Sequence, residues 1–131
     1  MKIYTVPSHL APKDLLLLAD PSEERLGQYL PEGICYVVED GGDILASCLV
    51  SRETPEVFEV RNIAVEPDKQ AEGIGTQLLR YVIEDVRHKG AKRLEVGTGT
   101  FGYPLIFYQR AGFRVYAVER GYYLINYEEP L

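Results

Sequence analysis

The sequence lacks any apolar run long enough to cross a lipid bilayer. Its longest apolar stretch, residues 15–19, is far shorter than the ~20 residues that a transmembrane helix needs. The N-terminus shows no basic segment followed by an apolar one, which a secretory signal would require. We therefore expect a cytoplasmic protein that does not bind membranes.

Histidine and cysteine are scarce. The two histidines, His9 and His88, are isolated in the sequence, so we expect no metal site. The two cysteines, Cys35 and Cys48, lie on either side of the turn signal Asp-Gly-Gly-Asp at residues 40–43, and a two-residue turn there would place them opposite each other. That geometry allows a disulfide. The absence of an export signal favours two reduced, buried thiols instead.

Positive charge is also in short supply. The chain has 14 Lys and Arg against 20 Asp and Glu, a net charge of −6, which is the wrong sign for a protein that binds nucleic acid through its phosphates. Residues 1–60 carry a net charge of −7 and residues 61–115 carry +3. The first segment suits a cation and the second an anion if both face one cleft; otherwise they are solvated surfaces.

The 131 residues form an ordinary globular composition, with 46% hydrophobic and 26% charged residues. A chain of this length buries enough surface to fold without a metal or a disulfide. It contains no repeat, linker or low-complexity tract. We expect a single domain over residues 1–131.

Turn residues and hydrophobic periodicity divide the chain into alternating strands and helices. The expected strands are residues 1–5, 33–39, 44–51, 57–65, 92–98, 113–118 and 122–127. The expected helices are residues 11–20, 23–30 with Ser22 as N-cap, 74–89 ended by Gly90, and 104–110. The strand, helix and strand between residues 57 and 98 imply a parallel crossover, so we expect an α+β fold with a mixed sheet.

The segment at residues 65–76 combines a strand end, a turn and a helix start, with glycines at alternate positions. Glycine lets the backbone approach a bulky anion, and the free amides of a helix N-terminus favour phosphate. A P-loop would need lysine after Gly75, where Thr76 stands, and a dinucleotide fingerprint would need a third glycine in place of Leu78. The alternative interpretation is a tight turn with close helix packing.

The Gln-x-x-Gly-x-Gly pattern at residues 70–75 resembles motif A of the GNAT family of N-acetyltransferases. The sequence Glu-Val-Arg-Asn-Ile-Ala-Val at residues 59–65 is similar to the family's fourth strand, and residues 105–113 are similar to its Tyr-x-x-x-Gly-Phe segment. The match covers residues 57–113 in order and spacing. It implies a GNAT-like fold, a mostly antiparallel sheet with a splayed parallel strand pair and flanking helices.

The resemblance implies that acetyl-CoA is the co-substrate, with its pantetheine arm between the splayed strands. Backbone groups of Ile63, Ala64 and Val65 would pair with that arm. Gln70 would lie at the edge of the pyrophosphate, and Thr100 would supply a hydroxyl to the arm where the family often has asparagine. The remaining contacts to the pyrophosphate would come from the backbone amides of Ala71, Glu72, Gly73, Ile74, Gly75 and Thr76.

The resemblance also implies two catalytic side chains. Tyr108 would protonate the departing thiolate; the alternative is a core aromatic on an amphipathic helix. Glu59 lies where several family members have a general base, and strand alternation predicts one shared face for Glu59, Arg61, Ile63 and Val65. The alternative for Glu59 is a surface ion pair with Arg61.

The function implied is direct transfer of an acetyl group from acetyl-CoA to a primary amine, without a covalent enzyme intermediate. The acceptor would be a small molecule or a peptide, and the negative first half of the chain favours a cationic one. The family resemblance allows a homodimer. The alternative is a catalytically weak acyl-CoA-binding regulatory or interaction module.

Overall fold

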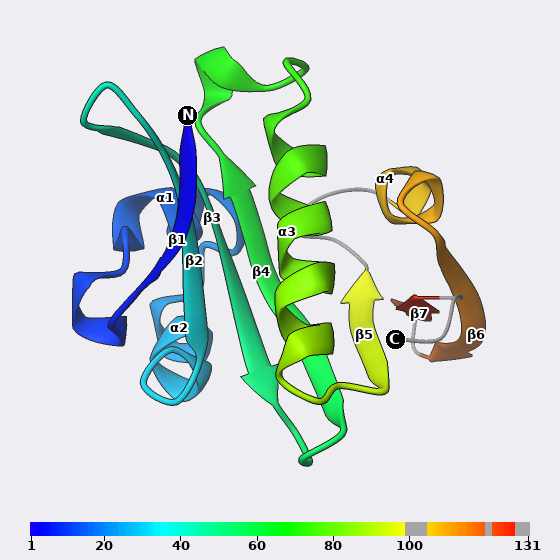
Figure 1. Ribbon diagram of the computed structural model, residues 1–131. Coiled ribbons are helices and arrows are strands. Elements are labelled where there is room, and N and C mark those ends of the chain that lie inside the picture. Colours follow the sequence, from blue (N-terminus) through cyan, green and yellow to red (C-terminus); the bar gives the residue numbers. More distant parts are fainter. Residues whose placement is uncertain (99–104, 120–121, 128–131) are drawn as a thin grey trace.

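The computed structural model describes residues 1–98, 105–119 and 122–127, which build a seven-stranded sheet flanked by helices (Figure 1). The strands are β1 (Lys2–Val6), β2 (Ile34–Asp40), β3 (Asp43–Arg52), β4 (Val57–Val65), β5 (Arg93–Thr98), β6 (Phe113–Glu119) and β7 (Tyr122–Tyr127). The helices are α1 (Lys13–Ala19), α2 (Glu23–Tyr29), α3 (Ile74–His88) and α4 (Leu105–Arg110), with the 3-10 helices η1 (Ser8–Leu10) and η2 (Pro67–Lys69). The predicted strands and α-helices are confirmed to within a few residues; the 3-10 helices were not predicted.

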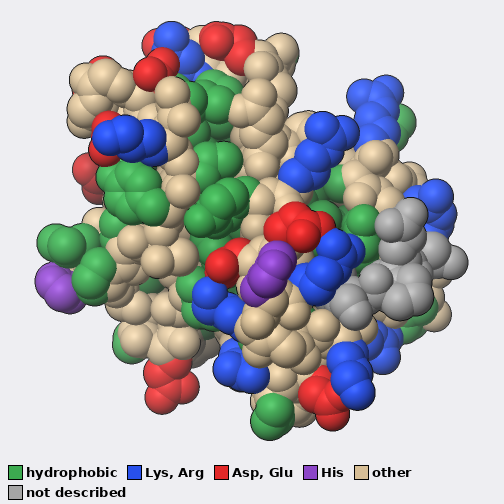
Figure 2. All heavy atoms as spheres, viewed as in Figure 1, with side chains coloured by type: hydrophobic (Ala, Val, Ile, Leu, Met, Phe, Trp, Pro, Cys, Tyr) green, Lys and Arg blue, Asp and Glu red, His purple; other side chains and the backbone are tan. Residues whose placement is uncertain are grey.

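Capping and periodicity account for the helix boundaries. The Ser22 hydroxyl accepts a hydrogen bond from the Arg25 amide at 3.1 Å, as expected for the N-cap of α2. Helix α3 buries its apolar residues at three- and four-residue steps, and its outer side carries charges of both signs (Figure 2). Asp85 of α3 pairs with Lys89, the C-cap, at 2.6 Å. In the described ranges, no helix has the length and apolar character needed to cross a membrane.

The strands lie in the order β1-β2-β3-β4-β5-β7-β6. Strands β4 and β5 are parallel, joined by a crossover through α3, and the other neighbouring pairs are antiparallel. The mixed α+β sheet is therefore confirmed. The sequence did not predict that β7 would lie between β5 and β6, so that the last strand pairs with β5.

The sheet separates two apolar clusters. Helix α3 packs on one face, and Tyr108 of α4 belongs to the same cluster. Helices α1 and α2 cover the other face, where their cluster includes residues of β2 and β3, and α1 also packs on β4 (Figure 1). The α1/α2 face carries polar side chains where it continues across β4 and β5, and this is the side on which Glu59 lies.

A bulge in β3 corrects the expected position of the cysteines. The hairpin has its predicted two-residue turn at residues 41–42, but Glu39 pairs with Ile44 and Val38 with Ala46, which leaves Leu45 as an extra residue and shifts the register by one. Cys48 therefore lies opposite Tyr36, and the prediction that it faces Cys35 is wrong. The two thiols point into different clusters, both are free and buried, and burial raises the pKa of each. This arrangement agrees with the interpretation of two reduced, buried thiols.

Gly112, in the turn between α4 and β6, should not tolerate a side chain. Its φ is 106°, and a Cβ there would lie 2.8 Å from Cε2 of Tyr127. Gly112→Ala should lower the free energy of unfolding by about 1–3 kcal/mol, measured by urea denaturation. Gly27→Ala is the matched control on α2, because no described atom lies within 4 Å of its added Cβ, and it should stabilise by up to ~1 kcal/mol. Equal stability of the two variants would contradict this account.

Candidate active site

Strands β4 and β5 pair only along their first four residues. The last pair in their parallel register is Val60 with Val96. Strand β4 continues to Val65 and β5 to Thr98, with no further pairing between them in the described ranges. The predicted splayed pair is therefore confirmed. In the described ranges, the peptide groups on this side of β4 have no partner from β5 after Val60. Because backbone donors and acceptors require partners, a group inserted here can form hydrogen bonds with them.

A second bulge lies in β4 where the strands part. The register with β3 shifts by one between Val60 and Asn62, which leaves Arg61 as an extra residue. Ile63 and Val65 consequently face α3, whereas Glu59 pairs with Arg61 on the other face. The prediction that all four side chains share one face is wrong, because the bulge reverses the alternation that an uninterrupted strand would have.

The turn after β4 contains two residues in the left-handed region, Ala71 with a φ of 69° and Gly73 with a φ of 80°. Glycine adopts this conformation at little cost, and Gly73 is the N-cap of α3. The Gln70 side-chain amide donates to the Val65 carbonyl at 3.1 Å and ties the turn to the end of β4. Gln70 thus has a structural contact, and its contact to a pyrophosphate stays a prediction.

The N-terminus of α3 presents free amides. No side chain of the described residues caps it, and its first helical hydrogen bond runs from the Gln77 amide to the Gly73 carbonyl. The amides of Ile74, Gly75 and Thr76 therefore belong to the orphan donors of the first turn, at the positive end of the helix dipole. This end of α3 is joined by the turn at residues 66–73 to the end of β4 that does not pair with β5, and it can bind an anion.

Glu72 lies outside helix α3. The helix begins at Ile74 with Gly73 as N-cap, so Glu72 belongs to the preceding turn. Its side chain is exposed. A carboxylate here stands beside the amides that would bind the anion and opposes that binding.

Tyr108 is buried on α4. Its exposed fraction is 4%, and its ring makes edge-to-face contacts with Phe107 at 5.3 Å and Phe113 at 5.7 Å between centroids. It packs in the same apolar cluster as Ile63 and Val65. The ring is thus part of the core, as one alternative predicted, and its role as an acid stays a prediction.

Glu59 is half-buried and paired. Its Oε2 lies 2.8 Å from Nη1 of Arg61, so the predicted ion pair is present. Burial is the main cause that raises the pKa of Glu59, Arg61 lowers it, and the neighbouring carboxylates of Glu53 and Glu95 raise it further. A carboxylate with a raised pKa is a better proton acceptor, so the ion pair and a base role are compatible.

Glu95 is a neighbour that the sequence analysis missed. It lies directly beside Glu59 in the parallel register of β4 and β5. Tyr116 donates to its Oε2 at 2.8 Å, and Arg93 lies 3.3 Å from the same oxygen. The alternation of buried and polar residues in β5 indicates which face of the sheet Glu95 occupies. It does not indicate which residue of β4 lies beside Glu95, because that depends on the register of the two strands.

Comparison with known proteins identifies the family. Residues 31–115 match the family model described as an acetyltransferase (GNAT) domain. The chain belongs to the GNAT family. The uncharacterized N-acetyltransferase YvbK of Bacillus subtilis (strain 168) is 37% identical over 119 residues, which cover 90% of this chain and 77% of YvbK.

Solved GNAT structures share the fold. The IAA acetyltransferase from Bacillus cereus ATCC 14579 superposes with a TM-score of 0.88 and 33% identity, covering 98% of this chain and 99% of that one. A GNAT family acetyltransferase from Elizabethkingia anophelis, solved with acetyl-CoA bound, has a TM-score of 0.86 and 32% identity over 98% of this chain and 97% of its own. The GNAT fold and the N-acetyltransferase activity that the sequence predicted are therefore confirmed.

The GNAT domain brings most of the predicted site residues together. Residues 63–65 end β4, residues 70–76 form the following turn and helix start, and Tyr108 shares an apolar cluster with Ile63. Thr100 lies outside the described residues.

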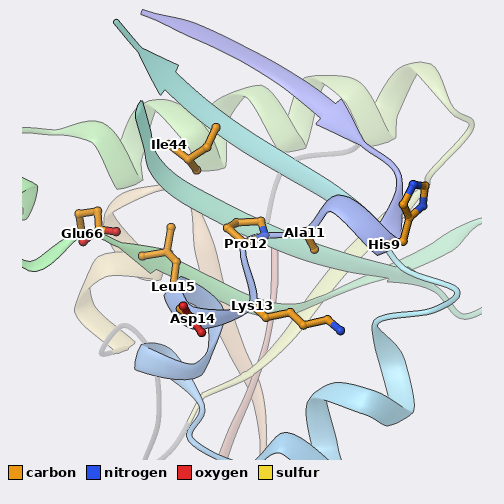
Figure 3. Close-up of a pocket in the computed structure, with 8 residues that line it drawn as sticks. All are labelled: His9, Ala11, Pro12, Lys13, Asp14, Leu15, Ile44 and Glu66. Carbon is orange, nitrogen blue, oxygen red and sulfur yellow. The ribbon is translucent and has the colours of Figure 1, made fainter. Parts of the chain in front are cut away.

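A cavity of about 410 Å³ lies on the α1 side of this GNAT domain (Figure 3). Ile44 of β3 and Glu66, directly after β4, contribute from the sheet, and the other residues come from the η1–α1 segment. The lining is His9, Ala11, Pro12, Lys13, Asp14, Leu15, Ile44 and Glu66. None of the predicted site residues lines this cavity, although Glu66 follows directly after Val65 in the chain.

Proposed function

We propose that this GNAT protein binds acetyl-CoA with the pantetheine arm in the β4–β5 gap and the pyrophosphate at the N-terminus of α3. The observation that carries the proposal is that the second half of β4 does not pair with β5 in the described ranges, and that the turn after β4 leads into the uncapped N-terminus of α3. The relative from E. anophelis, solved with acetyl-CoA bound, supports it. Backbone groups of residues 63–65 hold the arm, amides of residues 71–76 hold the pyrophosphate, Gln70 lies at its edge, and Thr100 contacts the arm.

The reaction is a direct attack of a primary amine on the thioester carbonyl. Glu59 receives the proton of the ammonium through a water, which frees the amine lone pair for attack. A backbone amide of β4 that points at the developing oxyanion contributes roughly 3–4 kcal/mol. Tyr108 donates a proton to the departing thiolate; with reference pKa values of about 10 for a phenol and 8.5 for a thiol, this transfer is only slightly uphill.

We infer that the acceptor is cationic. Two carboxylates, Glu59 and Glu95, lie side by side on the sheet face opposite α3, one residue before the strands part. Glu53 adds a third carboxylate through Arg61, and Arg61 and Arg93 offset two of the three negative charges. The remaining negative charge favours an acceptor with a positive group, such as a polyamine, an aminoglycoside or a lysine side chain.

Glu72→Lys should tighten acetyl-CoA binding. The substitution replaces a repulsive charge beside the α3 amides with an attractive one, and each such charge contributes about 0.3–1 kcal/mol at low salt, so Kd should fall about threefold or more. Isothermal titration calorimetry at low and high salt measures the change. Glu32→Lys, an equal charge change at an exposed position in the turn before β2, is the control and should leave Kd nearly unchanged. Equal Kd values for wild type and Glu72→Lys would contradict the placement of the pyrophosphate.

The proposed function is tested by binding and turnover together. Calorimetry and thermal shift measure acetyl-CoA binding, and release of free CoA thiol measures turnover with 1,5-diaminopentane, spermidine, tobramycin, a lysine peptide and, as the singly charged comparison, pentylamine. We expect binding, and faster turnover of the multiply charged amines. Binding without turnover would favour the acyl-CoA-binding module. If acetyl-CoA produced neither heat in calorimetry nor protection from thermal unfolding, the proposal would be wrong. Light scattering tests whether the protein forms the homodimer that the family resemblance allows; the cytoplasmic location stays a prediction.

A further inference from the structure

We infer that Arg61, the extra residue of the β4 bulge, is a positioning residue that holds Glu59 in place and keeps it ionised for reaction with the amine. The inference rests on the proposed function, in which Glu59 receives the proton of the ammonium. It concerns a side chain that the sequence analysis treated only as a competing ion-pair partner.

The bulge places both Arg61 and the following residue, Asn62, on the same face of the sheet as Glu59. Asn62 donates from Nδ2 to the Leu16 carbonyl of α1 at 2.9 Å, and the Arg61 guanidinium lies 5.9 Å from the ring centroid of Tyr29 on α2. Two consecutive side chains therefore project toward the α1/α2 side, which an uninterrupted strand would not allow. The extra residue brings a cation to the point where β4 leaves β5.

Every nitrogen of the Arg61 guanidinium has a partner. Nε donates to the Ser51 hydroxyl at 2.9 Å, Nη2 to Oε1 of Glu53 at 2.8 Å, and Nη1 contacts Oε2 of Glu59 at 2.8 Å. The Ser51 hydroxyl in turn donates to Glu53 Oε1 at 2.6 Å, which closes the network. Because the guanidinium is planar and rigid, partners on Nε and Nη2 fix the direction of Nη1.

This arrangement holds one oxygen of Glu59 and leaves the other available. Oε2 is bound to Arg61, whereas Oε1 accepts no hydrogen bond from the described residues. The side chain is 28% exposed, so a water or an amine can reach it. An oriented carboxylate with one free oxygen is the geometry that a proton acceptor requires.

Arg61 is also the one cation that acts against protonation of Glu59 in the described part of the chain. Burial raises the pKa of Glu59, and so do Glu53 from the β3–β4 connection and Glu95 from β5, while Arg61 lowers it. The remaining charged or titratable side chains on this face, Arg93 of β5 and Tyr116 of β6, both bind Glu95. Without Arg61, each remaining influence on Glu59 favours its neutral form.

The test is the pH dependence of kcat/KM for Arg61→Met, which keeps the length of the side chain without its charge, and for Arg61→Lys. Each is assayed with the panel amine that wild type uses best, so that ionisation of the amine contributes equally. We expect Arg61→Met to move the acid limb of the kcat/KM profile to higher pH by about one unit. At a fixed pH on the limb, kcat/KM should therefore fall about tenfold, and at pH values above the limb it should fall much less. Arg61→Lys should restore part of the shift, and the KM for acetyl-CoA should not change.

Arg52→Met is the matched control, because it removes an arginine from the neighbouring strand β3 that donates to the Pro55 and Lys89 carbonyls instead of to Glu59 or Glu95. It should leave the acid limb near its wild-type position. A merely structural role for Arg61 predicts an equal loss at every pH without movement of the limb, and that result would overturn the inference. Glu59→Gln separates the role of Glu59 as the base from the role of Arg61. If Glu59→Gln keeps the wild-type acid limb, the assigned base is wrong and the proposed function fails at that point. If Glu59→Gln loses the acid limb but Arg61→Met leaves it at its wild-type pH, only the inference about Arg61 fails.

Discussion

Tyr108→Phe should lower kcat by about 100-fold while the Kd for acetyl-CoA stays nearly unchanged. The substitution removes the proposed proton donor to the thiolate and keeps the ring that packs between Phe107 and Phe113. Since that ring supplies the core contacts, thermal unfolding should change little. Steady-state release of CoA thiol and calorimetry with acetyl-CoA provide the two measurements.

Tyr81→Phe controls for the loss of a phenol. Tyr81 lies on α3, is 39% exposed, and contacts Tyr36 by its ring. This variant should keep wild-type turnover. Equal turnover of Tyr108→Phe and wild type would remove Tyr108 from the mechanism and leave it as a core aromatic. A loss of stability large enough to explain the lower kcat would have the same consequence.

Glu59→Gln should lower kcat/KM for the amine by about 100-fold at neutral pH, because an amide cannot receive the proton of the ammonium. The raised pKa of Glu59 sets the sign of the pH dependence. As the pH falls through that pKa, Glu59 takes up a proton and ceases to act as a base, so activity declines at a higher pH than an ordinary glutamate would give. The pH profile of kcat/KM should show this acid limb in wild type and lose it in the variant.

Glu56→Gln is the matched control for this change of charge. Glu56 is exposed and its carboxylate pairs with Lys92 at 2.9 Å, away from Arg61. The control should retain wild-type activity and the acid limb. A Glu59→Gln variant as active as wild type would show that a water chain or another group accepts the proton.

The order of helices and strands could be predicted because local signals specify it. The three- and four-residue spacing of apolar residues predicts α3, and the glycine pair at residues 41–42 predicts the β2–β3 hairpin. The Gln-x-x-Gly-x-Gly turn and the Tyr-x-x-x-Gly-Phe segment predicted the GNAT family, which the family comparison confirms. The sequence placed Gln70 and Gly73 at the turn, where the structure has them.

The register errors have one physical cause. The bulges at Leu45 in β3 and at Arg61 in β4 each add one residue to a strand, and a single added residue reverses which face the following side chains occupy. Neither bulge has a glycine or proline to mark it. Packing of the sheet against helices on both faces decides such positions, so the cysteine pairing and the shared face of Glu59 with Ile63 were both predicted wrongly.

The sequence by itself determined the fold class, the family and the identity of the turn that faces the pyrophosphate in our proposal, because these depend on residues close together in the chain. Only the tertiary structure decided that Glu95 lies beside Glu59, that β7 lies between β5 and β6, and that Arg61 binds Ser51, Glu53 and Glu59 at once. These contacts join separate segments through strand register, which the spacing of residues along one strand does not specify.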